Sequence, residues 1–245
     1  MRRWTASYRF RWTPVISFDR RRAALLDWVE SNLNPVSFRD SDGEVGIALK
    51  RGVRVTITRH SMTLEDSVAA TDGVASLRPM LTGVIGVIEP REVLLLSGAI
   101  AWSIDMNDPD YDHATGSLAG QLTGITTPLA SGTAASDIAA LMDFSGPRFH
   151  IQAEFGVVGP SELKDRLADA DVGKLRRRPM GRVSAKAFQG IPATSLFVDT
   201  FIHNTERDTL DGEQGVVAAI DQADAAAREV AEAVAKSVVE REKVK

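Results

Sequence analysis

The first residues of the chain alternate between apolar and polar side chains, as in a strand with one buried face. The even positions are apolar and the odd positions are polar or basic: Trp4, Ala6, Tyr8, Phe10 and Trp12 against Arg3, Thr5, Ser7, Arg9 and Arg11. We expect the aromatic side chains to face the core and Arg9 and Arg11 to face solvent or a partner. The first 18 residues are also arginine-rich and free of acid, as in organelle targeting segments, but such segments rarely sustain this alternation.

After Pro14 the apolar residues recur every three or four positions, which predicts an amphipathic helix up to the Asn34-Pro35 step. The stretches 36–40, 44–50 and 52–59 then indicate three short strands joined by turns. A helix over 74–88, bent near Pro79, and a long strand over 92–106 complete this half.

The second half loosely repeats this scheme, with a strand over 147–158, a helix over 161–170, a strand over 194–204 and a long helix over 213–241. We therefore predict an α+β fold of two loosely similar strand–helix–strand halves on a mainly antiparallel sheet. The expected division is an N-terminal half over 1–105, a connecting segment with short helices over 106–145, and a C-terminal half over 146–245 that ends in the long helix.

The composition excludes several kinds of site. The chain has 245 residues and no cysteine, so a disulfide scaffold, thiol catalysis, an iron–sulfur cluster and cysteine-ligated zinc are all excluded. A chain without cysteine is compatible with the reducing cytoplasm, which is the location that we expect. No apolar run approaches the ~18 residues that span a bilayer, so we expect no contact with a membrane.

Motifs for nucleotide binding and for nucleophilic catalysis are missing. Gly173-Lys174 lacks the earlier glycine and the following Ser or Thr of a phosphate-binding loop. Ser117 stands beside a glycine rather than between two, unlike the nucleophile of a strained turn. We therefore expect no cofactor and no known type of enzyme.

The stretch Asp105 to His113 carries four aspartates, an asparagine and a histidine, and it raises the question of a metal site. A calcium-binding loop that began at Asp105 would place Pro109 at a ligand position, and one that began at Asp108 would place His113 where a glycine is needed. Both registers fail, so we expect no metal. The alternative is a turn around Pro109 in which Asp112 or Thr115 caps a weak helical run over 116–125.

The histidines offer a second candidate site. None of them lies in a metal-binding spacing, and residues four apart on one strand are ~13 Å apart, so His150 with Glu154, or Asp199 with His203, cannot hold one ion. A dispersed carboxylate and histidine site would need the two late strands to pair. Its members form the candidate polar cluster: Asp105, His150, Asp199 and His203.

Positive charge is concentrated in two places. Residues 1–60 hold 12 Lys and Arg against 6 Asp and Glu, which leaves 17 against 27 for the rest of the chain. A second cluster, over 173–186, contains the candidate anion-binding residues Lys174, Arg176, Arg177, Arg178 and Arg182. Such a loop either contacts phosphates non-specifically or simply remains solvated. Because the pI is only about 5.6, we expect nucleic-acid binding to be weak at most.

The long C-terminal helix carries a narrow apolar stripe of small residues: Val216, Ile220, Ala223, Ala227, Val230, Val234 and Val238. Two interpretations of the stripe are open. It packs against the same helix of a second chain, which would make a homodimer, or it lies on the chain's own sheet.

These patterns favour an intracellular module for binding or assembly, with an unidentified protein partner. One alternative is a nucleic-acid-associated factor that uses the basic loop. The other is an enzyme built on the dispersed carboxylate and histidine cluster.

Overall fold

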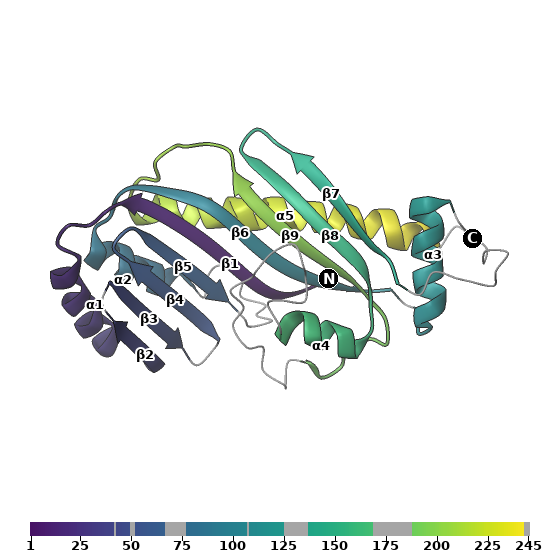
Figure 1. Cartoon of the computed structure of the whole chain (residues 1–245), viewed down its shortest axis with the longest axis horizontal. Helices are drawn as coiled ribbons and strands as arrows, with labels where there is room; N and C mark the ends of the chain where they lie inside the picture. The colour runs from purple at the N-terminus through teal and green to yellow at the C-terminus, as the bar shows by residue number, and fades with distance from the viewer. Residues whose placement is uncertain are drawn as a thin grey trace.

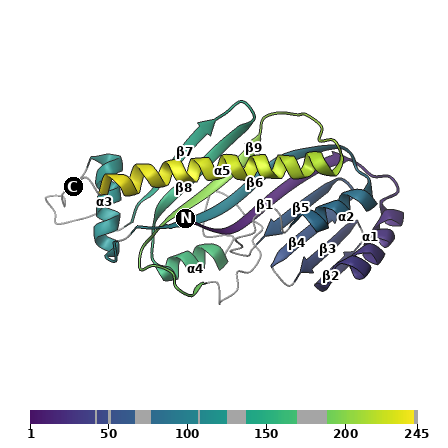
Figure 2. The ribbon, with the colours of Figure 1, turned by 180° about the vertical axis from the view of Figure 1, so that it is seen from behind.

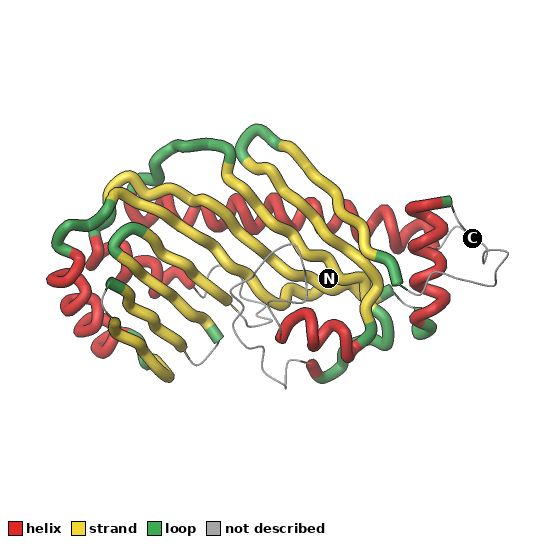
Figure 3. The backbone as a smooth tube through the Cα atoms, in the orientation of Figure 1, coloured by secondary structure: helices red, strands yellow, loops and turns green. Residues whose placement is uncertain are grey.

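The computed structural model describes residues 1–41, 43–49, 52–66, 77–106, 108–124, 137–168 and 188–242. These residues form one nine-stranded sheet in which every neighbouring pair is antiparallel. Its strands, in chain order, are β1 (Arg2–Thr13), β2 (Pro35–Ser41), β3 (Glu44–Leu49), β4 (Val53–Thr58), β5 (Ser61–Asp66), β6 (Arg91–Asp105), β7 (Ala139–Ser145), β8 (Phe149–Val158) and β9 (Ser195–Asn204). The order across the sheet is β2-β3-β4-β5-β1-β6-β9-β8-β7 (Figures 1 and 3).

The helices are α1 (Phe18–Asn32), α2 (Arg78–Ile88), α3 (Tyr111–Thr123), α4 (Pro160–Ala168) and α5 (Gly212–Glu242). The predicted α+β class, the mainly antiparallel sheet and the long C-terminal helix are therefore confirmed. The strands of the two halves meet where β6 pairs with β9, which makes the sheet continuous. No helix of the described residues is long and apolar enough to cross a membrane.

Three features differ from the sequence-based prediction. Pro79 lies in the first turn of α2, where a proline fits because its missing N–H would have no partner, so it begins the helix instead of bending it. Strand β5 was not predicted. Strand β7 lies in the connecting segment over 106–145, for which short helices such as α3 but no strand had been predicted.

The two faces of the sheet have different environments. Helix α5 crosses one face and contacts β6, β8 and β9, with α2 beside it (Figure 2). The main core lies on this helix-covered face. Helix α4 is on the opposite face, where it covers a smaller apolar cluster. Among the described helices it is the only one there, so much of that face is open (Figures 1 and 3).

The apolar stripe of α5 packs on the chain's own sheet. All seven of its members are buried, from Val216 at 0% exposed to Val230 at 9%. This arrangement corresponds to the second of the two interpretations, and it leaves the stripe occupied within the chain.

Strand β1 follows the predicted alternation except at its start. Ala6, Tyr8, Phe10 and Trp12 are buried in the main core, and Arg9 and Arg11 are exposed. The register against β6 shifts between Arg3 and Thr5, so Trp4 is the extra residue of a β-bulge. The bulge turns Trp4 to the face of α4, where it stacks on Phe188 at 5.4 Å.

Candidate functional site

The predicted polar cluster does not converge, although β8 and β9 do pair. His150 lies directly opposite His203, Asp199 lies opposite Glu154, and Asp105 lies opposite Ser195. Positions four residues apart on one strand are separated by ~13 Å. The structure therefore brings the two histidines together and leaves Asp199 and then Asp105 successively farther along the sheet.

His150 has hydrogen-bonding neighbours on the hairpin of β7 and β8. Its Nδ1 lies 3.2 Å from Ser145 Oγ, and its Nε2 lies 3.4 Å from Asp143 Oδ1. These three residue types also make up nucleophilic triads, but such triads act in sites that exclude water. The side chains of His150 and Asp143 are 38% and 53% exposed, so we interpret the hydrogen bond with Ser145 and the contact with Asp143 as surface interactions.

The Asp105–His113 stretch begins at the last residue of β6, and its final residues, from Asp110 to His113, form the start of α3. Asp110 is the N-cap residue, and its carboxylate accepts hydrogen bonds from the backbone N–H groups of Asp112 and His113. The predicted capping residues, Asp112 and Thr115, are therefore wrong, because the helix begins earlier, at Tyr111. A hydrogen bond from His113, with one from the backbone of Asp110, holds the pKa of the Asp108 carboxyl below its usual range.

Two further questions concern a metal site and the basic cluster over 173–186. Among the residues that the structure describes, no group of three histidine or acidic side chains is placed to hold a metal ion. The candidate anion-binding residues Lys174, Arg176, Arg177, Arg178 and Arg182 lie outside the described residues.

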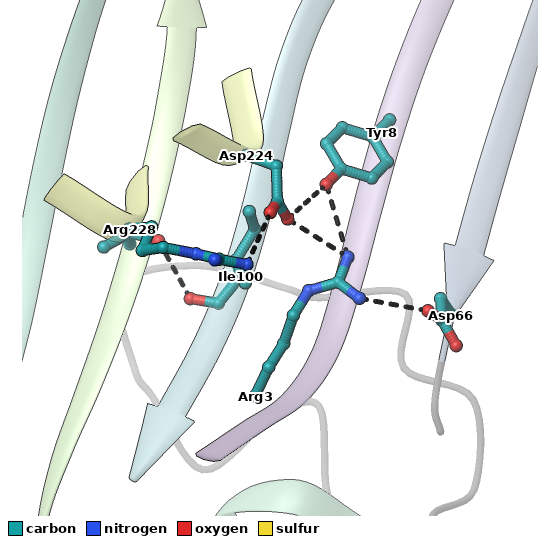
Figure 4. Close-up of polar contacts among 7 residues, drawn as sticks. Arg3, Tyr8, Asp66, Ile100, Asp224 and Arg228 are labelled. Atoms are coloured by element: carbon teal, nitrogen blue, oxygen red, sulfur yellow. Dashed lines mark hydrogen bonds and ion pairs between the residues drawn. The ribbon is translucent and has the colours of Figure 1, made fainter. Parts of the chain in front are cut away.

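A buried ionic network, which was not predicted, joins the sheet to α5 (Figure 4). Arg3, turned to the helix-covered face by the bulge, contacts Asp66 at 3.2 Å and Asp224 at 3.3 Å. The Tyr8 hydroxyl donates to Asp224 at 3.0 Å. Arg228 contacts the second oxygen of Asp224 at 3.5 Å. The positive charges of two guanidinium groups are thus matched by the negative charges of two carboxylates, and the Tyr8 hydroxyl lies among them.

Burial determines the protonation of this network. Burial raises the pKa of the Tyr8 phenol, and although the charge of Arg3 opposes this effect, the net shift is upward. Burial alone would lower the pKa of Arg3, but Tyr8, Asp224 and Asp66 together raise it above its ordinary value. Tyr8 is therefore a neutral hydroxyl and Arg3 a cation, which suits a structural connection better than proton transfer.

The open face of the sheet carries a row of mostly polar residues that crosses all nine strands. Direct cross-strand partners connect them from β2 to β7: Arg39, Gly46, Thr56, Thr63, Arg9, Ser97, His203, His150 and Ser145. Arg9, Arg39 and His203 are exposed. Alternation alone placed Arg9 on the outer face, but the neighbours of Arg9 depend on registers that the sequence does not show.

No protein-family model matches this chain, and comparison with curated proteins finds no significant relative. The two edges and the open face of the sheet are therefore the features from which a function can be inferred.

Proposed function

We propose that this protein is a binding and assembly module that self-associates through the edge strand β7. The observation that carries the proposal is the exposed, weakly protected edge of that strand. Leu141 and Met142 are 49% and 45% exposed, and β7 contains no proline, lysine or arginine. An edge strand without such residues presents free backbone groups to another strand.

The opposite edge of the sheet is better protected. Strand β2 begins with Pro35, and its Arg39 and Asp40 form ion pairs with Glu44 and Arg22. Proline and charged side chains are the common means by which proteins prevent pairing at an edge. The contrast supports β7, rather than β2, as the strand that pairs.

A second copy of the same chain fits this edge. An antiparallel pair of identical strands is related by a two-fold axis, which is the commonest symmetry of homodimers. If the axis passed near Met142, Asp143 would face Leu141 of the second copy, so that two carboxylates would not stand directly opposite each other. Because the stripe of α5 is occupied by its own sheet, we place the interface at β7 and not at the C-terminal helix.

Light scattering over a range of concentrations tests the proposal. We expect a mass that rises toward a dimer for the parent and remains that of a monomer for Met142→Lys, because a charge would then stand at the strand-pairing edge. Phe38→Lys is the matched control, since Phe38 is 62% exposed on the other edge strand, and it should dimerise like the parent. A parent that is monomeric at high micromolar concentration would overturn the proposal, as would a Met142→Lys variant that dimerises normally.

A further inference from the structure

We propose that the open face of the sheet binds single-stranded nucleic acid through Arg9, Arg11 and Phe201. This surface is distinct from the β7 edge, so the inference does not depend on the proposed self-association.

The positive side of this surface consists of Arg9 and Arg11. Both are exposed. They lie on the same face of β1 because side chains two residues apart on a strand share a face, and the rise of the strand places them ~7 Å apart. In the described part of the chain neither guanidinium has an ion pair or side-chain hydrogen bond. These two charges are therefore available to an anionic ligand.

The other arginines of this face have acidic neighbours. Arg39 forms an ion pair with Glu44. Arg54 stands directly opposite Glu65, whose pKa is raised by burial and lowered by the charge of Arg54, with a net upward shift. Arg9 and Arg11 have no such acidic neighbour among the ion pairs of the described residues. We therefore expect the anionic groups of the ligand to lie over β1.

Aromatic rings lie two strands away on β9. Phe201 and His203 are in edge-to-face contact, with ring centroids 4.4 Å apart. His203 is separated from Arg9 by Ser97 alone, and Phe201 is separated from Ser7 by Ala99. Adjacent strands are ~4.8 Å apart, so the aromatic residues and the arginines stand on one face of the sheet, ~10 Å apart, with small side chains between them.

The combination of two arginines with aromatic rings on one open face fits a single strand of nucleic acid. Guanidinium groups bind phosphates with two parallel hydrogen bonds, and aromatic side chains on an open antiparallel sheet stack unpaired bases. A duplex hides the faces of its bases and could use only the arginines. Glu154 and Asp199 stand opposite each other farther along β8 and β9, and Arg166 lies 3.8 Å from Glu154. The acidic charge there is only partly balanced, which disfavours a polyanion at that position relative to the end of the face near His203.

The affinity should be modest because the whole chain carries a net charge of −4. Only a few phosphates can be neutralised, and non-specific binding of this kind has dissociation constants of roughly 10⁻⁴ to 10⁻⁶ M at physiological salt. We expect a value in the range of tens of micromolar.

Fluorescence anisotropy with a labelled 20-nucleotide oligo(dT), titrated at several salt concentrations, tests the inference. Arg9→Ala with Arg11→Ala should weaken binding at least tenfold and reduce the slope of log affinity against log salt by about 1.4, since each phosphate contact contributes about 0.7. Phe201→Leu keeps an apolar side chain but removes the aromatic ring, so it should weaken binding roughly tenfold and leave the slope unchanged. Arg20→Ala with Lys236→Ala is the matched control, because it removes two exposed charges from helices.

Three results would overturn the inference. The first is no binding by the parent at low salt. The second is equal weakening by the control pair and by the Arg9 and Arg11 pair, which would show a diffuse charge effect. The third is equal affinity for a duplex of the same length together with no effect of Phe201→Leu. Met142→Lys should bind the oligonucleotide like the parent, which separates this inference from the proposed assembly.

Discussion

The hydroxyl of Tyr8, on the first strand, donates a 3.0 Å hydrogen bond to the carboxylate of Asp224, on the last helix. The two residues are 216 positions apart, and both are buried, Tyr8 at 0% and Asp224 at 7% exposed. Arg3 contacts both of them, at 3.4 Å and 3.3 Å. The network therefore joins the start of the chain to α5 inside the core, and it fixes the position of the helix on the sheet.

The first prediction concerns the charge of Asp224. Asp224→Asn keeps the size of the side chain but leaves the buried Arg3 with one carboxylate fewer, so it should destabilise the fold by about 3 kcal/mol. Urea denaturation measures the change. Asp221→Asn is the control on the same helix, because Asp221 and its partner Arg78 are 45% and 55% exposed, and exposed pairs contribute up to about 1 kcal/mol. Equal losses in the two variants would contradict a special role for the network.

The second prediction concerns the alkaline limit of stability. Burial raises the pKa of Tyr8 in the folded protein, so above the ordinary tyrosine pKa of about 10 the unfolded chain releases this proton first. The contribution of Tyr8 to stability is then fully present below about pH 10 and is lost as the pH rises above that value.

Urea denaturation at pH 9 and pH 11 should show the effect. Between these two pH values, the free energy of unfolding of the parent should fall by up to about 1.4 kcal/mol more than that of Tyr8→Phe. Only the pH unit above the ordinary tyrosine pKa of about 10 contributes to this difference. Tyr111 is the other tyrosine of the chain, and its pKa is also raised by burial. Since Tyr111 is only half-buried, Tyr111→Phe should change the pH dependence less than Tyr8→Phe. Parallel pH profiles of the parent and Tyr8→Phe would show that the phenol does not control alkaline unfolding.

The sequence allowed the strands and helices with strong periodicity to be predicted, because local spacing determines which face is buried. It could not show the bulge at Trp4, which exists only as a mismatch with β6. The bulge decides that Arg3 enters the network instead of facing solvent. The partnership of His150 with His203 was likewise one of several possible registers, so the candidate cluster could be named from the sequence but its dispersal along the sheet could not.

The third prediction separates the two faces of β1. Trp12 is buried in the main core and Trp4 in the cluster under α4, so replacing either by alanine should cost about 3–5 kcal/mol. Hydrogen exchange should differ between the variants: Trp4→Ala should deprotect the amides of α4, and Trp12→Ala should not. Identical exchange in α4 for both variants would contradict the placement of Trp4 on the α4 face.

The fourth prediction concerns the start of α3. Asp110→Ala should destabilise the protein by about 0.5–2 kcal/mol, because the carboxylate of Asp110 satisfies two backbone N–H groups at the helix end. EDTA should leave the melting temperature unchanged. A fall of several degrees that calcium or zinc restores would mean that this stretch does hold a metal ion.

The last prediction uses two glycines of α2 that differ only in their surroundings. A Cβ atom at Gly83 would lie 2.0 Å from the Trp28 ring of α1, whereas one at Gly86 would have no atom within 4 Å. Alanine is the better helix former by about 1 kcal/mol, so Gly86→Ala should stabilise the protein by up to that amount. Gly83→Ala should instead destabilise it by about 1–3 kcal/mol, because the ring has to move out of a packed contact. Replacing Trp28 by leucine makes room at this contact, so adding Gly83→Ala to Trp28→Leu should cost less than adding it to the parent. Equal effects of Gly83→Ala in the two backgrounds, measured by urea denaturation, would show that the α1–α2 contact does not depend on this glycine.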